Sequence, residues 1–445
     1  TLGSQGIDQP VLAESYAVQD IVMQYPKTDS LYTVIEPMRM SYLAVPHTRV
    51  LPNGVALHHL QGEDKGIVRL DILFKGGYAV QYKPLQALFT NRMLREGSEA
   101  FSGTEISQKL DYYGAWIDMY SSQECNHIIL YVLAKHFPLL LPVVEDFVKH
   151  PTFPQENLDV VRRNNKAHFL INSKKVEVVA QRHFERALWG DSHLLGQMVQ
   201  AADYDAITRD DLLQYYEEVY SHHTCTLFLT GTNDSAVIDA VVAAFGSEAW
   251  GTATQVVVNV PAPASLVGCH KITLKDTLQS AVKVGCITLP ACHPDFFDLR
   301  ILNVLLGGYF GSRLMSNIRE ENGYTYDIIS EIDAYGKDNA FMVSSQAANE
   351  YVAPLLLELY KEIERLRVED ISLAEVELVR NYIMGELCRE FEGVIAKTEV
   401  FVNAWLSGDS FDSVNRYINA VNAVTPQRLQ YIASNYVYTL ISKVV

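Results

Sequence analysis

An arginine and a tyrosine seven residues apart, Arg319 and Tyr326, are the side chains best placed for chemistry in this sequence. They belong to the stretch Leu305–Ser330, which opens with Gly307 and Gly308 and predicts a short amphipathic helix followed by a strand. Glycine has no Cβ, so another surface can approach the backbone closely there. Such a layout can hold a guanidinium and a phenol side by side above a groove. The alternative is structural: a helix C-terminus with a dipole-matched arginine and a glycine cap.

The elements that must position this pair alternate between strands and helices along the chain. Leu314 and Ile318 are four residues apart and mark the buried side of the Arg319 helix. We expect a second helix to begin with Thr104 as its cap. The pattern predicts strands over 55–60, 67–74, 115–121, 127–134, 225–231 and 281–287, and helices over 85–94, 104–113, 137–148, 154–175, 177–189, 210–220, 236–245 and 296–306.

The order of elements repeats, which indicates a duplication. The segment DYYGAWIDMYS around Gly114 is echoed by EENGYTYDIIS around Gly323, and two further segment pairs follow at offsets of 209 to 218 residues. We expect an α+β fold of two homologous halves, each a mostly antiparallel sheet covered by helices, closing as a clamshell over a cleft. The predicted divisions are a lead-in at 1–46, a first half at 47–250, a linker at 251–266 and a second half at 267–445.

Composition narrows the function classes. The net charge of −17 over 445 residues argues against nucleic-acid binding, because no basic surplus exists to neutralise phosphates. No apolar run reaches the roughly 18–20 residues that a membrane helix needs, so no transmembrane segment is predicted. The first residues show neither a basic nor an apolar signal region. We therefore expect a soluble protein of cytoplasmic or periplasmic location, with the compartment left open.

Cysteines and histidines do not form a recognisable metal motif. The six cysteines include no C-x-x-C pair, and Cys269-His270 and Cys292-His293 lack a second pair at ligand spacing. Reduced, mostly buried thiols are expected, which mildly favours a reducing compartment. His58 and His59 are neighbours on a predicted strand and must point to opposite faces, so they cannot bind one ion together.

The duplicated halves, the LPNG that opens the first and the pattern LGG-(x)3-SRL…IRE-x-x-GY-x-Y in the second resemble the pitrilysin/insulinase-like (inverzincin) zinc metallopeptidase family. The resemblance covers residues 46–445 and is most specific in the second half. Within this family, the chain is similar to the non-zinc subunits of processing-peptidase-like heterodimers. The resemblance implies that Arg319 and Tyr326 reach across the chamber to the substrate carbonyl and stabilise the oxyanion, with Gly307 and Gly308 in the substrate-binding region.

The family's zinc motif, H-x-x-E-H, is missing. The resemblance places Leu88 and Arg92 at the two histidine positions and Asn91 at the glutamate position. Leucine has no lone pair, arginine is a permanent cation, and asparagine is a poor substitute for a carboxylate base. The third ligand position falls near His168, and one imidazole alone makes no zinc site. The chain alone is therefore predicted to bind no metal or other cofactor and to be no zinc peptidase.

The resemblance implies a division of labour. We expect a homologous partner of similar size that carries H-x-x-E-H and zinc, while this chain supplies Arg319 and Tyr326. The expected substrates are unfolded peptides taken in extended form as an added strand at a sheet edge. Two alternatives stay open: a non-catalytic scaffold or peptide-binding protein with an idle cleft, and an active peptidase with an unrecognised metal set.

Overall fold

A computed structural model of the chain describes residues 43–62, 66–254, 263–266, 268–335 and 338–437. Residues 40–445 form one compact unit, and the description below concerns this unit alone. Most of the predicted lead-in and the central part of the predicted linker lie outside the described residues. The described part consists of two α+β halves, as the sequence predicted, which we call the first half (43–254) and the second half (268–437).

The first half is built on a six-stranded sheet with the strand order β1-β2-β6-β3-β5-β4. All neighbouring strands are antiparallel except the parallel pair β2 and β6. The central strand β3 is apolar along most of its length and buried at seven of nine positions. The edge strand β1 is exposed throughout, and β4 alternates between exposed and buried residues. The strands are β1 (His47–Val50), β2 (Ala56–Leu60), β3 (Ile67–Lys75), β4 (Trp116–Ser121), β5 (Cys125–Leu133) and β6 (Cys225–Thr230).

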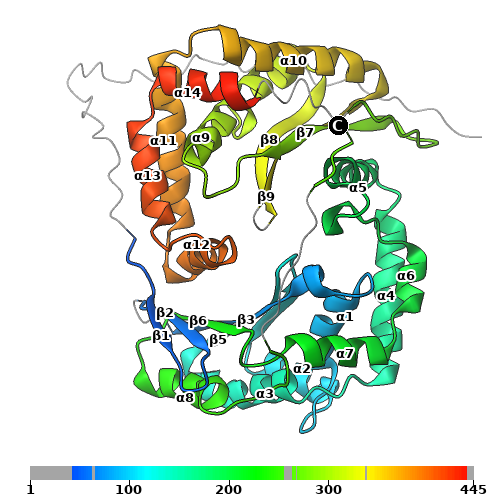
Figure 1. The fold of residues 1–445 in the computed structure, drawn as a ribbon, viewed down its shortest axis with the longest axis vertical. Helices are drawn as coiled ribbons and strands as arrows, with labels where there is room; N and C mark the ends of the chain where they lie inside the picture. Colours follow the sequence, from blue (N-terminus) through cyan, green and yellow to red (C-terminus); the bar gives the residue numbers. More distant parts are fainter. Residues whose placement is uncertain (1–42, 63–65, 255–262, 267, 336–337, 438–445) are drawn as a thin grey trace, which may run out of the picture. The chain divides into compact units, whose positions relative to one another are not determined.

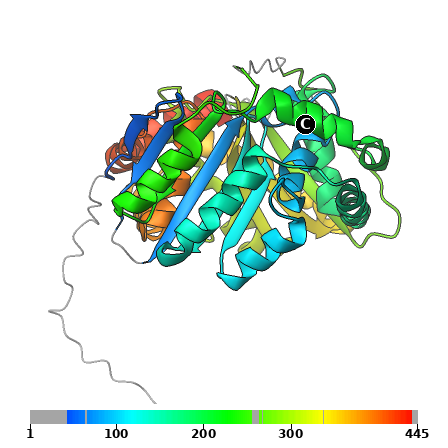
Figure 2. The same cartoon turned by 90° about the horizontal axis from the view of Figure 1, so that it is seen from below.

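Helices cover one face of this sheet, where Figures 1 and 2 show α3 and α8 lying across the strands. The expected Thr104 cap of α2 was wrong: Ser102 is the cap, and it exchanges hydrogen bonds with Glu105 in a capping box that satisfies two backbone donors. The helices are α1 (Gln86–Met93), α2 (Gly103–Tyr112), α3 (Phe137–Lys149), α4 (Gln155–Asn172), α5 (Val176–Trp189), α6 (Ala201–Ala206), α7 (Arg209–Val219) and α8 (Ser235–Gly246).

The second half repeats part of this arrangement. Its sheet has the antiparallel order β7-β9-β8, which matches β3-β5-β4 of the first half. Trp116 faces Tyr131 in the first sheet, and Ile329 faces Ser344 in the second, 213 residues further along on both strands. The elements are β7 (Gln279–Thr288), β8 (Thr325–Tyr335), β9 (Asp338–Ala348), α9 (Phe296–Gly307), a π-helix (Met315–Glu321), α10 (Val352–Val368), α11 (Leu373–Glu390), α12 (Val394–Leu406), α13 (Ser413–Ala423) and α14 (Pro426–Ile432).

Each half supplies a helix that covers the sheet of the other half. From the first half, α5 packs on β7 and β9, where Phe184 and Trp189 join one apolar cluster with Met342. From the second half, α12 packs on β6, where Phe228 contacts Trp405, and Phe411 in the loop after α12 contacts His58 of β2. The two helices begin 218 residues apart, at Val176 and Val394, and so are counterparts in the duplication. The halves therefore share their cores.

A buried ion pair fastens α12 to the first sheet. The Arg69 guanidinium donates to both Asp71 oxygens at 2.6 and 2.7 Å, and to Glu399 of α12 at 2.6 Å. Arg69 and Asp71 are fully buried. Burial raises the pKa of the Asp71 carboxyl, whereas the short forked contact with a guanidinium favours the carboxylate. Asp71 and Glu399 raise the pKa of Arg69 despite its burial, so Arg69 stays a cation.

Within the described ranges, no helix has both the length and the apolar character needed to cross a membrane.

Replacing Asp71 should destabilise the fold. Asp71→Ala is expected to lower the free energy of unfolding by about 3–5 kcal/mol, because it leaves a buried guanidinium without its main partner. Asp118→Ala is a matched control, since Asp118 lies on the same face of the sheet but is exposed. Guanidinium chloride titration followed by circular dichroism measures both variants. Equal losses would contradict the role assigned to the buried pair.

Candidate functional site

The three positions of the missing zinc motif lie on α1, and Asn91 at the glutamate position is a structural residue. Its side chain is fully buried. The amide nitrogen donates to the backbone oxygens of Tyr120 and His127, at 2.8 and 3.1 Å, and the amide oxygen accepts from the Tyr220 hydroxyl at 3.1 Å. Asn91 thus ties α1 to β4, to β5 and to the residue after α7. A carboxylate could not donate these two hydrogen bonds.

The other positions do not form a set of metal ligands. Leu88 packs against the first-half core, and Arg92 donates to the side chain of Asn165 on α4. His168, three residues beyond Asn165, is exposed. Among the residues that the structure describes, no three histidine, cysteine, aspartate or glutamate side chains gather closely enough to hold a metal ion. A zinc ion therefore does not fit this donor set, in which His168 is the single imidazole and the Asn91 amide oxygen already accepts from Tyr220.

Arg319 and Tyr326 lie together in the second half. The Arg319 guanidinium is placed over the Phe310 ring at 4.4 Å and over the Tyr326 ring at 5.6 Å. Its only close carboxylate within the described part is Glu320, at 3.9 Å. A cation between two aromatic rings is held by attraction to both rings and has its orientation fixed. Tyr326 is 87% exposed, so its phenol can be reached by a bound molecule.

The segment that carries Arg319 differs from the amphipathic α-helix expected there. Leu314 and Ile318 are both buried, as predicted. However, the segment is a π-helix, in which the Asn322 backbone N–H donates to the Asn317 carbonyl five residues earlier, at 3.0 Å. The Asn322 side chain also bonds Asn317, at 2.9 Å to its carbonyl oxygen and 2.7 Å to its amide oxygen. These side-chain contacts favour the wider turn of a π-helix. Such turns are rare and occur frequently at functional sites.

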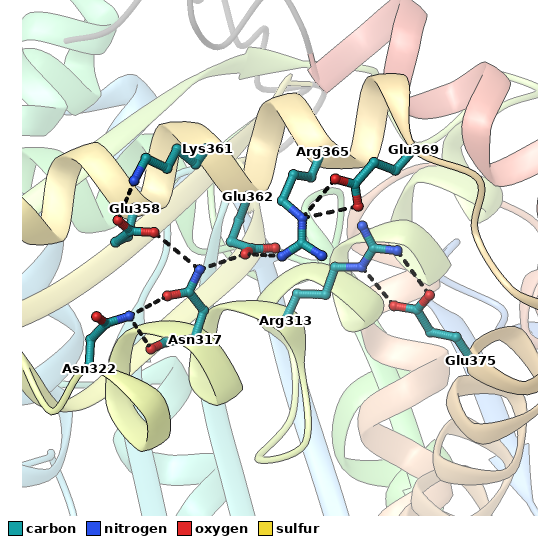
Figure 3. Close-up of polar contacts among 9 residues, drawn as sticks. All are labelled: Arg313, Asn317, Asn322, Glu358, Lys361, Glu362, Arg365, Glu369 and Glu375. Carbon is teal, nitrogen blue, oxygen red and sulfur yellow. Dashed lines mark hydrogen bonds and ion pairs between the residues drawn. The ribbon is translucent and has the colours of Figure 1, made fainter.

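A polar network holds this helix against α10 (Figure 3). Asn317, two residues before Arg319, donates to Glu362 at 2.6 Å, and Glu362 also accepts from Arg365. Nearby, Arg313 forms a forked pair with Glu375 on α11 at 2.7 and 2.9 Å. The Glu362 side chain is buried although it is acidic. The network therefore fixes the base of the helix while Arg319 extends from it.

A pocket of about 430 Å³ adjoins Tyr326 on the face of the second sheet that α5 partly covers. Its polar lining includes Glu177 from the first half and Asp327 from the second. Lys283 also lines it, and burial lowers the pKa of its ammonium group. Thus Tyr326 borders a hollow to which both halves contribute.

The two glycines before the π-helix approach protein atoms. A Cβ on buried Gly307 would lie 2.7 Å from the Ser330 hydroxyl, so this glycine lets α9 pack closely on β8. A Cβ on exposed Gly308 would lie 2.7 Å from the Val304 Cα. Their contact with substrate stays a prediction.

Two contributors were missed in the sequence. Phe310 forms one side of the Arg319 stack, and its place just after the glycine pair could have suggested this role. Glu362 lies among the apolar positions Leu359, Ile363 and Leu366 of α10. An acidic residue on the buried stripe of a helix is a signal for a buried polar network.

Comparison with known proteins shows which family this chain is similar to. Residues 206–383 match the Peptidase M16 inactive domain. The chain is 24% identical over 363 residues to the uncharacterized zinc protease YmxG of Bacillus subtilis, which covers 80% of this chain and 87% of that protein. It is 23% identical over 265 residues to the non-peptidase homolog YmxG of Helicobacter pylori, covering 58% and 60% of the two chains.

A further relative is the mitochondrial-processing peptidase subunit alpha-1 of Dictyostelium discoideum, 26% identical over 204 residues, or 44% of this chain and 30% of that one. Among solved structures, a peptidase M16 inactive domain from Pseudomonas fluorescens superposes with a TM-score of 0.77 at 19% identity, covering 88% of this chain and 95% of the other. The family resemblance drawn from the sequence is confirmed. The chain is similar to the M16, pitrilysin/insulinase-like peptidase family over most of its length, with Leu88, Asn91 and Arg92 at the positions of the family's zinc motif.

Proposed function

We propose that this chain is the non-catalytic, substrate-binding subunit of a two-chain zinc endopeptidase that cleaves unfolded peptides. The observation that carries the proposal is the Arg319 guanidinium, stacked with Phe310 and Tyr326 and directed by a helix anchored at its base. The side chains at the zinc-motif positions pack or form hydrogen bonds within the first half. At the arginine and tyrosine positions, Arg319 and Tyr326 offer hydrogen-bond donors that a bound peptide can reach. If two chains divide the work, one chain can lose the zinc ligands and still keep the arginine and the tyrosine, which is the pattern found in this sequence.

In the proposed complex Arg319 and Tyr326 bind the carbonyl oxygen of the peptide bond under attack. Both groups are hydrogen-bond donors, and the guanidinium is charged at any physiological pH. Donors of this kind, held in place before the reaction, are worth roughly 3–4 kcal/mol each to a transition state in which the oxygen becomes negative. The two aromatic contacts and the Asn317–Glu362 bond reduce the reorganisation that this step would otherwise need.

The partner would be a homologous chain with an intact H-x-x-E-H helix. Zinc bound there would supply the activated water, and this chain would contribute no metal ligand. The similarity to a subunit of a processing peptidase supports a partner of this kind. The peptide would be held in extended form. The edge strand β4 supports this, because on its outer side no described strand pairs with its backbone.

The central test is a mixing experiment. The partner is recovered by affinity purification of this chain from its native host, and an H-x-x-E-H protein of about the same size is expected. Peptide hydrolysis should appear only when the two chains are combined. Arg319→Ala should then lower kcat by about 100- to 1000-fold, the usual effect of removing an oxyanion donor, and Tyr326→Phe should also lower kcat.

Arg389→Ala serves as the control, because Arg389 is exposed on α11 and pairs only with Glu386 among the described residues. It should leave kcat unchanged. Stable assembly of the two chains with no effect of either Arg319→Ala or Tyr326→Phe would reject the proposal in favour of a scaffold. Hydrolysis by this chain alone, with bound metal in equal amount, would reject it in favour of an independent peptidase.

A second prediction concerns Asn91. Asn91→Asp changes one atom, yet it replaces two N–H donors with an acceptor facing the carbonyl oxygens of Tyr120 and His127. It should lower the free energy of unfolding by about 2–4 kcal/mol, because buried acceptors would then face one another without a proton. Asn165→Asp, at a partly exposed amide, should cost far less. Thermal unfolding measures both, and equal stability of the two variants would contradict the structural role of Asn91.

A further inference from the structure

On the face of the first sheet opposite α3 and α8, the side chains of four paired strands form rows that run across the sheet. One row across β6, β3, β5 and β4 contains Thr230, Arg69, Tyr131 and Trp116. The next row contains Phe228, Asp71, Ile129 and Asp118, and the third Thr226, Leu73, His127 and Tyr120. Residues in these rows share one face, because side chains alternate along each strand.

Only part of this face is covered. The second-half helix α12 lies over the β6 side, where Thr398 donates to the Thr230 hydroxyl at 2.9 Å. Exposure rises toward β4: Arg69 is 1% exposed, Tyr131 is half-buried, and Trp116 is 68% exposed. The open part of the face is therefore its β5–β4 side.

This open part combines aromatic rings with a carboxylate. Along β4 the exposed positions are Trp116, Asp118 and Tyr120, whereas Ile117 and Ser121 between and beside them are buried. The Tyr120 ring is fixed by stacking on His127 at 4.3 Å. Trp116 lies directly opposite the half-buried Tyr131 in the strand register, so two aromatic residues meet on this side of the face.

The charge on this face is negative on balance. Of its two β3 cations, Arg69 is already bound by Asp71 and Glu399, and Lys75 lies over the Trp405 ring of α12. Half of the Glu399 side chain stays exposed. The pKa of Tyr120 is raised by burial and further by Glu399, Asp71 and Asp118. Burial and the same carboxylates also raise the pKa of Tyr131, although Arg69 opposes them. The face therefore favours a positively charged guest.

We propose that Trp116, Asp118 and Tyr120, with Tyr131 and Glu399 beside them, form a subsite for an arginine or lysine side chain of an extended peptide. The peptide as guest rests on the proposed function. Its cation lies over the aromatic rings and pairs with Asp118, which combines two attractions that each act on a charged group. A peptide added at the β4 edge presents every second side chain to this face. A peptide with basic residues two positions apart therefore presents each of them to this face.

The test measures binding to the isolated, full-length chain. Three fluorescein-labelled peptides of twelve residues, otherwise of serine, threonine and alanine, are compared by fluorescence anisotropy. The first has two arginines two positions apart, the second has citrulline at the same two positions, and the third has two adjacent arginines. The first should bind about five to ten times more tightly than its citrulline twin, and the third should fall between them.

Variants locate the effect. Asp118→Asn and Trp116→Ala should each bring the ratio of arginine to citrulline affinities close to one. Asp111→Asn, at an exposed aspartate of α2 away from this face, should leave the ratio unchanged. Circular dichroism confirms that each variant is folded, and Asp118→Asn, an exposed isosteric change, keeps the test valid if Trp116→Ala does not fold.

Equal affinity for the arginine and citrulline peptides, or an unchanged ratio in Asp118→Asn, would overturn the inference, as would failure of the folded chain to bind any of the three. These results are distinct from those of the mixing experiment. A chain that activates its partner without preferring arginine contradicts only the subsite. A chain that prefers arginine but activates no partner contradicts only the proposed function.

Discussion

Each sheet in this protein has two faces, and its own half covers only one of them. A sheet with an uncovered apolar face is unstable in water, so the second face must find cover elsewhere. The solution here is reciprocal: α5 of the first half packs on β7 and β9, and α12 of the second half packs on the β2–β6 side of the first sheet. The Arg69–Asp71–Glu399 group lies where one of these helices meets its sheet, and it adds a specific polar contact to an otherwise apolar interface.

This arrangement also decides where a binding surface can exist. Because α12 packs on the β6 side of the first sheet, the β5–β4 side of that face stays open, and its exposed residues are aromatic and acidic. On the second sheet, the part of the face beyond α5 becomes the pocket beside Tyr326. Both open areas are thus by-products of the same incomplete cover. Tyr326 borders the second of these areas.

Much of the fold followed from periodicity, since the runs AWIDMYS and CTLFLT form β4 and β6 within one residue of the predicted bounds. Strand β1 was missed because its four residues are all exposed and show no alternation of polar and apolar side chains. At the site, the sequence identified Arg319 and Tyr326, and the structure places them side by side. The ring of Phe310 and the anchor Glu362 were not identified. Their roles depend on contacts between separate elements, such as the bond from Asn317 to a residue 45 positions later.

The three bonds of Asn91 show a similar limit. Its substitution for a glutamate was visible in the sequence, but the sequence alone suggested only a lost function. The structure shows a residue that joins α1 to two strand backbones and to Tyr220. Long-range partners of this kind, 29 to 129 residues away, leave no local pattern in a single sequence.

The exchange of covering helices bears on how such a chain could arise. A single half would have to borrow its cover from a second copy, which makes a symmetric homodimer the natural precursor of the duplicated chain. Joining the two copies replaces a concentration-dependent association with an intramolecular one. It also removes the obligation that both copies be identical. One copy could then keep an arginine and a tyrosine while the other gave up its metal ligands, so that asymmetry of function followed from covalent linkage.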